Sequence, residues 1–225
     1  MPIYELHAHT AECDKAAHVG GAEMVRMYRD AGYDGMVITD HYFSLFFEWF
    51  ADELRPMTHE EQMHRYLKGY YAARAEGERI GFTVLPGAEA RLSDSINDYL
   101  LLGLEEEVFF RTPRLNEAES LTALIGMLPP ETCVVHAHPF RDNMTVRDPS
   151  NLFGIEVYNA GTKPFRNELA RTFAEYYGVA MTSGSDVHGI ERAAKGGIET
   201  DRIIRTPSDL RAVLRSGEYR LIESK

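Results

Sequence analysis

Two histidines one residue apart stand near the amino end, in the segment Glu5-Leu6-His7-Ala8-His9-Thr10. They follow a short apolar run that we expect to be a strand, and alternate side chains of a strand point to the same face. We therefore expect His7 and His9 to project together where this strand ends. Two imidazoles placed in this way can hold a metal ion, although a His-x-His pair alone also fits a solvated strand end.

Four further segments, each directly after an expected strand, are rich in imidazole and carboxylate groups. They are Thr39-Asp40-His41, Gly87-Ala88-Glu89, His136-Ala137-His138-Pro139 and Gly184-Ser185-Asp186-Val187-His188. With the amino end they offer eight candidate metal ligands, namely His7, His9, Asp14, His41, Glu89, His138, Asp186 and His188. Such mixed nitrogen and oxygen ligands suit zinc, manganese or iron, whereas calcium and magnesium favour oxygen alone.

Eight ligands are too many for one ion, so we expect two or three divalent transition-metal ions. Ions held close together need a shared carboxylate. Glu89 is the expected bridge, because it follows Pro86-Gly87 and the glycine lets the backbone approach closely. Any one of the eight could be an ordinary polar residue at a strand end, and it is the set that indicates a multinuclear site.

Apolar segments that read as strands alternate with helical patterns along the chain. The expected strands are 3–6, 36–39, 82–85, 99–102, 133–136, 154–157 and 179–182, with a last one at 219–222. The expected helices are 22–31, 58–79 with Thr58 and Glu61 as a capping box, 115–128, 165–177, and one opened by Thr206-Pro207-Ser208-Asp209 and closed by Gly217. We find no linker or repeat, so residues 1–225 are predicted to form a single α/β domain.

Ligand-type residues follow at least five of the expected strands. This pattern favours a (β/α) barrel with a metal site at the carboxyl ends of its strands, because an open sheet concentrates its site at one switch point. The sequence contains neither Gly-x-Gly-x-x-Gly nor Gly-x-x-x-x-Gly-Lys-Ser/Thr, which weakens the alternative of a nucleotide-binding open sheet.

Composition excludes several classes of protein. The chain has 225 residues with 24 Lys and Arg against 35 Asp and Glu, and its net charge of -11 disfavours binding to a nucleic-acid polymer. No apolar run is long enough to span a bilayer, no secretory signal is evident, and Cys13 and Cys133 form no disulfide framework. We expect a cytoplasmic protein without a membrane partner, and the sequence does not indicate its oligomeric state.

The ordered motifs closely resemble the PHP family, the polymerase and histidinol phosphatase superfamily, over nearly the whole chain. They are His-x-His-Thr with Cys13-Asp14 in place of Ser-Asp, then Thr-Asp-His, Gly-x-Glu, Ala-His-Pro and Gly-Ser-Asp-x-His. The resemblance implies a distorted (β/α)7 TIM-like barrel with a trinuclear site. It implies that the first metal is held by His7, His9, Glu89 and Asp186, the second by Glu89 and His138, and the third by Asp14, His41 and His188.

The chain departs from the family at the second metal. Many members carry a histidine just before a Leu-Leu-Gly, where this chain has Asn97-Asp98-Tyr99-Leu100-Leu101-Leu102-Gly103. Either Asp98 replaces that histidine as a ligand, or the second metal is held more weakly. His136, two residues before His138, could be a ligand, a support for a ligand or a core residue.

Four other residues are candidates for binding substrate. Arg141 follows His138 closely enough to reach an anion beside the metals, and a guanidinium can hold phosphate oxygens. Glu156 either faces the pocket or supports a ligand histidine, and Arg166 is a weaker phosphate candidate. Trp49 belongs to the aromatic segment 42–50, which could form a lid or a wall for an aromatic substrate, or could pack on the barrel or at an interface.

These features predict a metal-dependent phosphoesterase that hydrolyses a small phosphomonoester, such as a histidinol phosphate-like or nucleotide phosphate. Metal-bound hydroxide would attack phosphorus, Arg141 would neutralise the phosphoryl oxygens, and Asp186 or His188 would pass a proton to the leaving alkoxide. The alternatives are a metal-dependent amide or lactone hydrolase and a non-catalytic PHP scaffold. A scaffold would be expected to have lost ligands that this chain retains.

Overall fold

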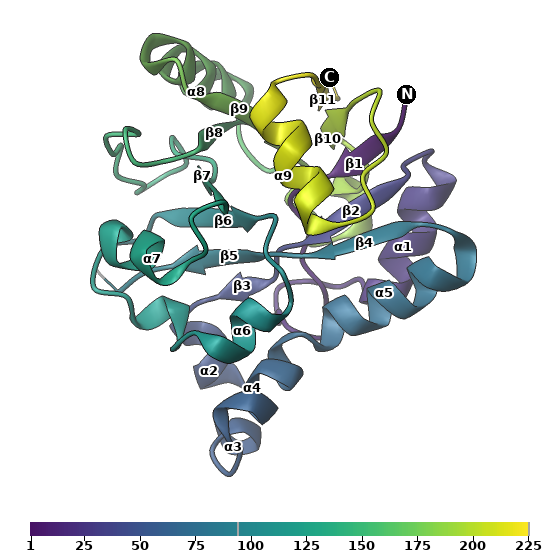
Figure 1. Cartoon of the computed structure of the whole chain (residues 1–225), viewed down its shortest axis with the longest axis vertical. Helices are drawn as coiled ribbons and strands as arrows, with labels where there is room; N and C mark the ends of the chain where they lie inside the picture. The colour runs from purple at the N-terminus through teal and green to yellow at the C-terminus, as the bar shows by residue number, and fades with distance from the viewer. Residues whose placement is uncertain (94, 225) are drawn as a thin grey trace.

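The computed structural model describes residues 1–93 and 95–224, which form a mixed α/β fold with two sheets (Figure 1). The first sheet has the order β11-β10-β1-β2-β4, with the bounds Arg220–Glu223, Gly196–Glu199, Ile3–Glu5, Gly35–Ile38 and Thr83–Pro86. The second has the order β3-β5-β6-β7-β8-β9, with the bounds His41–Tyr42, Ala88–Arg91, Asp98–Leu102, Cys133–His136, Gly154–Asn159 and Ala180–Gly184.

Two strands of the first sheet continue directly into the second. Two residues separate β2 from β3, and Gly87 alone separates β4 from β5. A β-carbon on Gly87 would lie 2.7 Å from Cγ1 of Val37 and 3.0 Å from the carbonyl oxygen of Leu101. The bend therefore requires a glycine, and it brings the start of β5, with Glu89, into the second sheet.

Within the described ranges the sheets do not close, so the predicted (β/α)7 barrel is wrong. β10 runs antiparallel beside β1, and β11 runs antiparallel beside β10, so that the two strands occupy the edge that a closed barrel would pair with β9. β6 is antiparallel to both β5 and β7, which breaks the alternation of strand and helix that a barrel needs. Beyond the ends of β1 and β9, Ala8 and Val187 form an isolated parallel bridge.

All the expected strands are present, with shifts of one or two residues at their ends. Three short strands were not expected, β3, β5 and β10. β3 and β5 carry the polar side chains of the site, and β10 begins with two glycines, so none of them shows the apolar pattern of a strand.

The helices surround the two sheets (Figure 1). Their bounds are Gly21–Asp30 (α1), Ser44–Trp49 (α2), Ala51–Leu54 (α3), His59–Tyr66 (α4), Lys68–Ile80 (α5), Glu107–Arg111 (α6), Leu121–Met127 (α7), Pro164–Tyr177 (α8) and Pro207–Ser216 (α9), with 3-10 turns at Leu115–Glu117 and Ile190–Arg192. The capping box at Thr58 and the start of α9 after Thr206 are confirmed, and Thr206 also forms a capping box, with Asp209. The expected helix 58–79 is two helices that break at Leu67, and the expected helix 115–128 is a 3-10 turn followed by α7, which Ser120 caps.

The strands are buried on both faces by different helices. Met36 of β2 belongs to the larger apolar cluster with α1 and α5, whereas Val37 belongs to a smaller cluster with Leu210 and Leu214 of α9. In Figure 1, α9 lies in front of β1 and β2. Alternate residues of a strand therefore pack against α1 and α5 on one face and against α9 on the other.

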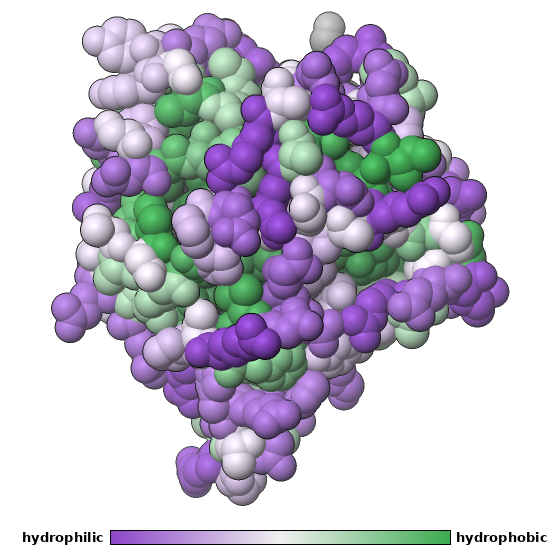
Figure 2. Space-filling model, in the orientation of Figure 1, coloured by the Kyte–Doolittle hydropathy of each residue, from purple (hydrophilic) through white to green (hydrophobic). Residues whose placement is uncertain are grey.

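The surface in Figure 2 is mainly hydrophilic along α5 and over the protrusion formed by α2, α3 and α4, and hydrophobic side chains appear as separate patches. Across the part of the chain that the structure describes, no helix combines the length and the apolar character that a bilayer span requires.

Two glycines of α5 and α7 differ in the space around them. A β-carbon on Gly69 would lie 1.8 Å from Oγ1 of Thr10, whereas one on Gly126 would have nothing within 4 Å. We expect Gly69→Ala to lower the free energy of unfolding by about 1–3 kcal/mol through overpacking. Gly126→Ala should leave it unchanged or raise it by up to about 1 kcal/mol, since alanine favours helix. Denaturant titration of both variants would reveal the difference, and equal effects would contradict this account of the α5 contact.

Candidate metal centre

Four side chains converge in what we call the first ligand group, His7, His9, Glu89 and Asp186. Nε2 of His7 lies 3.0 Å from Nε2 of His9. Each of these nitrogens lies 3.3 to 3.5 Å from Oε2 of Glu89 and from Oδ1 of Asp186. Four ligands at about 2.0–2.2 Å from a tetrahedral ion are about 3.3–3.6 Å apart. The spacing of this group therefore fits a divalent metal ion.

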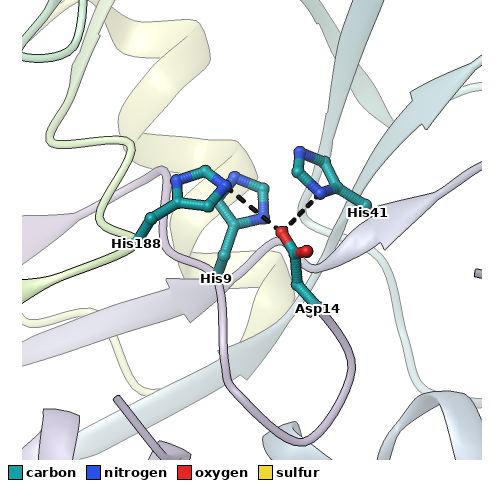
Figure 3. A group of neighbouring side chains, drawn as sticks. All are labelled: His9, Asp14, His41 and His188. Carbon is teal, nitrogen blue, oxygen red and sulfur yellow. Dashed lines mark ion pairs between the residues drawn. The ribbon is translucent and has the colours of Figure 1, made fainter. Parts of the chain in front are cut away.

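A second cluster, the Asp14 group, contains His9, Asp14, His41 and His188 (Figure 3). Oδ2 of Asp14 lies 2.7 Å from Nδ1 of His41 and 3.2 Å from Nε2 of His188. Within the described residues, Oδ2 of Asp14, Nδ1 of His41 and Nδ1 of His9 are buried without a hydrogen bond. Atoms that lie this close without the geometry of a hydrogen bond fit ligands that point at a shared cation. The sequence assigned Asp14, His41 and His188 to this position, and the structure adds His9.

A third cluster, the Asp98 group, contains Glu89, Asp98 and His138. Nε2 of His138 lies 2.9 Å from Oε1 of Glu89 but 3.8 Å from Oδ2 of Asp98. Both oxygens of Asp98 accept hydrogen bonds from Arg91, at 2.6 Å from Nε and 2.7 Å from Nη2. The carboxylate that could replace the missing histidine is therefore already paired with a guanidinium.

Two of these ligands have a backbone conformation that is rare for residues other than glycine. His138 has φ 31° and Asp186 has φ 49°. Such conformations persist where the surroundings fix the chain, and they are common at functional sites. In this fold the backbone N–H of His138 donates to Oε2 of Glu156 at 3.0 Å, and Oδ2 of Asp186 accepts from Nδ2 of Asn159 at 3.3 Å.

Glu156 lies behind the ligands and is almost completely buried. Its Oε1 is 2.8 Å from Nδ1 of His7, and its Oε2 also accepts from Nδ2 of Asn159. A carboxylate on one ring nitrogen orients a histidine so that the other nitrogen faces the metal position. Of the two expectations for Glu156, this geometry is that of a support for a ligand histidine.

Two further buried acids, missed in the sequence, hold the loops that carry the ligands. Glu5 accepts from the backbone N–H groups of His7 and Ser185, both at 2.9 Å, and from the hydroxyl of Tyr28. Asp40 accepts from the backbone and hydroxyl of Thr10, and burial raises its pKa to about 7. The sequence offered one signal for these supporting roles: Glu5 stands two residues before His7, and Asp40 stands directly before His41.

The charges of the site balance one another in a buried environment. Burial disfavours the ionised forms of Glu89 and Asp186, but the neighbouring histidines, and for Asp186 also Arg141, hold the pKa of each carboxyl well below its ordinary value. Burial and the charge of His41 lower the pKa of His9 to about 3. His9 is therefore neutral at pH 7, as a metal ligand must be.

Arg141 lies at the border between the first ligand group and solvent. Its Nη2 donates to Oδ1 of Asn159 at 3.0 Å and pairs with Oδ2 of Asp186, while 32% of its side chain stays exposed. Arg166 pairs instead with Asp142, and no contact of the described chain places it beside the ligands.

His136 and Trp49 belong to none of the groups of candidate metal ligands among the described residues. His136 is buried and stacks on Tyr99, with ring centroids 5.2 Å apart. Burial, followed by the charge of His138, lowers the pKa of His136 to about 3, so it is a neutral ring. Trp49 is the last residue of α2 and is half-buried.

The aromatic segment 42–50 divides between the core and the site. Tyr42 and Phe46 are buried and pack edge-on against Tyr66, which is core packing. Phe43 differs, because its ring lies 4.4 Å from the ring of His41 and under the guanidinium of Arg91 at 4.8 Å. It lines a cavity of about 330 Å³ with Ser44, Arg91, Leu92, Ser93, Asn116 and Glu117. Phe43 is thus the aromatic side chain of this segment that lies beside a ligand histidine.

Comparison with known proteins finds a family model that matches part of the chain and solved structures with a similar fold. No curated protein sequence matches the chain. A family model described as PHP-associated matches residues 164–219, from α8 to the region just before β11. A two-domain protein from Bacteroides vulgatus ATCC 8482, described as containing a predicted PHP-like metal-dependent phosphoesterase, aligns with a TM-score of 0.68 and 15% identity over 99% of this chain and 65% of that one.

Two further solved structures align over most of both chains. PsfC from Pseudomonas syringae PB-5123 has a TM-score of 0.69 and 16% identity, with coverage of 99% of this chain and 91% of PsfC. An amidohydrolase from Chromobacterium violaceum, with bound sulfate and no metal, has a TM-score of 0.57 and 15% identity, with coverage of 96% and 95%. The chain has a PHP-type fold. The family model supports the resemblance stated from the sequence motifs over residues 164–219, and the solved structures support the fold that it implies.

In this PHP-type fold Glu89 contributes to two ligand groups, and this gives a direct test. We expect Glu89→Gln to lower the number of bound divalent ions per chain, because a neutral amide binds cations far less well than a carboxylate. The measurement is elemental analysis after loading with Mn²⁺ or Zn²⁺ and removal of free metal. Glu60→Gln, at an exposed position of α4, is the matched control. Full metal content in Glu89→Gln would show that Glu89 holds no ion.

Proposed function

We propose that the chain is a metal-dependent phosphoesterase that hydrolyses a small phosphomonoester. The observation that carries this proposal is the first ligand group, in which two imidazole nitrogens and two carboxylate oxygens lie 3.0 to 3.5 Å apart. The adjacent Asp14 group offers a second position, since His9 belongs to both. Two ligand sets this close are typical of two-metal hydrolases, which include phosphatases and aminopeptidases.

The ligand types suit manganese, zinc or iron rather than calcium or magnesium. His7, His9, Glu89 and Asp186 would hold one ion, and the Asp14 group would hold another. Bound there, the ions would polarise the phosphoryl group and lower the pKa of a water molecule. The protein's own contribution is to fix these ligands, which it does through the contacts of Glu156 and Glu5 with His7.

Arg141 would bind the phosphoryl oxygens. Its guanidinium touches Asp186 with one nitrogen, and part of the side chain remains open to solvent. A guanidinium has five N–H donors, so others stay available for an anion. The phosphate would then lie between the ligand groups and Arg141.

The proton for the leaving alkoxide would come from the exposed side of the site. Both oxygens of Asp186 have partners, Oδ1 facing the histidines and Oδ2 facing Arg141 and Asn159. Asp186 therefore acts as a ligand rather than a proton shuttle in this proposal. His188 is 20% exposed and its Nε2 faces Asp14, so this nitrogen can either hold an ion or carry the proton, but not both.

The second candidate function is a metal-dependent amide or lactone hydrolase. It is favoured by one observation, that a solved structure of the same fold is described as an amidohydrolase. The net charge of -11 weighs against a nucleic-acid polymer as substrate in either case.

A substrate panel separates these functions. The metal-loaded protein is expected to release inorganic phosphate from small phosphomonoesters and to leave amides and lactones intact, with Glu89→Gln inactive on all of them. Turnover of acyl substrates without release of phosphate would refute the proposal in favour of the second candidate. The absence of turnover on both classes would favour a non-catalytic scaffold.

Arg141 and Arg166 make a matched pair for testing the binding of phosphate. We expect Arg141→Ala to lower kcat/KM for phosphomonoesters by about ten- to more than a hundredfold, because a charge-assisted contact of about 1.5–3 kcal/mol is lost. Metal content should stay unchanged. Arg166→Ala removes a cation that pairs only with Asp142 among the described residues, and it should have little effect. Equal effects on kcat/KM would remove Arg141 from the binding site.

Phe43 and Phe46 separate a substrate wall from core packing. Phe43→Leu should reduce the preference for aromatic over aliphatic phosphate esters by about fivefold, since stacking contributes on the order of 1 kcal/mol. Phe46→Leu should lower the Tm and keep the preference, because Phe46 is fully buried. Preference ratios and melting curves on both variants would test this, and an unchanged ratio in Phe43→Leu would exclude the wall.

A further inference from the structure

The Asp98 group is the part of the ligand cluster that does not fit a metal ion. The first ligand group brings four donor atoms to the spacing of a coordination shell. The Asp98 group has only one such close pair, Glu89 Oε1 and His138 Nε2 at 2.9 Å. Its third donor, Oδ2 of Asp98, is 3.8 Å from His138 and already accepts a hydrogen bond from Arg91.

Arg91 makes a pair with Asp98 that is difficult to displace. The guanidinium engages both carboxylate oxygens, and this two-point contact is stronger and more directional than a single one. Asp98 is buried, so the loss of its partner would leave a buried charge without compensation. Arginine keeps its proton at every pH at which the protein is folded.

A metal ion bound to Oδ2 of Asp98 would lie next to this permanent positive charge. The guanidinium nitrogen is 2.7 Å from that oxygen, so the two cations would repel each other across a single ligand atom. Arg91 is also two residues from Glu89 on β5, and the charge of Glu89 acts on it. The positive charge that a metal would supply here is therefore already present.

We infer that the guanidinium of Arg91 takes the place of a metal ion in the Asp98 group, so that the chain binds two divalent ions and uses Arg91 as a fixed third cation. This inference rests on the proposed function only in one respect, that the first ligand group and the Asp14 group each bind a divalent ion. Arg91 also lines the cavity beside Phe43, where Oδ1 of Asn116 is buried with no hydrogen-bond partner among the described residues. A fixed cation at that wall would hold an anionic oxygen of the substrate.

The test is a count of bound ions that does not depend on any substrate. The whole chain is loaded with Mn²⁺ or with Zn²⁺, free metal is removed, and the ions per chain are measured by elemental analysis and by calorimetric titration. We expect two ions in the wild type and three in Arg91→Met, where Asp98 becomes free to bind metal. Asp98→Asn and the double variant Arg91→Met/Asp98→Asn should both bind two. Arg91→Lys, which keeps the charge, should also bind two.

Three ions in the wild type, with one lost in Asp98→Asn, would show that Asp98 is a ligand and would overturn the inference. Two ions in a folded Arg91→Met would overturn it as well. If Arg91→Met does not fold, the counts for the wild type, Asp98→Asn and Arg91→Lys decide.

The counts also separate this inference from the proposed function. If the wild-type protein binds no metal, both the inference and the proposed function are refuted. Two ions, with the third appearing in Arg91→Met, support the inference even if no phosphomonoester is hydrolysed. Three ions with release of phosphate refute the inference and leave the phosphoesterase intact.

Discussion

The buried carboxylate of Glu89 is the interaction on which the rest of the site depends. Its Oε2 lies 2.9 Å from His41, 3.3 Å from His9 and 3.5 Å from His7, and its Oε1 lies 2.9 Å from His138. Burying an ionised carboxylate away from water costs on the order of several kcal/mol unless neighbouring groups compensate its charge. The imidazoles compensate it in the structure, and cations shared among these groups would compensate it further. One side chain thus holds together ligands from three other segments of the chain.

The fold meets this constraint by bending strands rather than by closing a barrel. Gly87 lets β4 turn into β5, so that Glu89 lies under the loops that follow β1, β7 and β9. Buried acids then fix those loops from behind, Glu5 through the backbone after β1 and after β9, and Glu156 through His7 and the backbone of His138. Because each support holds two segments at once, the ligands can keep conformations that an isolated chain would avoid.

The three ligand groups are not equivalent, because only in the Asp98 group does an arginine of the chain pair with both oxygens of a ligand carboxylate. In the first ligand group and the Asp14 group, buried ligand atoms, including Oδ1 of Asp186 and Oδ2 of Asp14, have no hydrogen bond to any residue that the structure describes. In the Asp98 group the carboxylate has a guanidinium on both oxygens. The charge of Glu89 interacts with the guanidinium groups of Arg91 and Arg141. Two fixed positive charges therefore act on Glu89, beside the positions that fit metal ions. Such an arrangement suits an anionic substrate in a protein that is acidic as a whole.

The sequence by itself determined which residues could hold metal ions, because metal ligands are few in kind and their positions after apolar strands are visible in the order of residues. It named all the members of the first ligand group and of the Asp14 group, but not the short strands β3 and β5 that carry His41 and Glu89. Only the tertiary structure decided that the sheets stay open, because β10 pairs with β1 and β11 pairs with β10 through backbone hydrogen bonds that side-chain patterns do not encode. It also decided the contacts of Asp98, Glu156 and Phe43. Each of these contacts depends on a partner from another strand or loop, or on the direction of a side chain. Arg91, for example, reaches Asp98 across the antiparallel pair β5 and β6. Spacing along the chain does not fix such contacts.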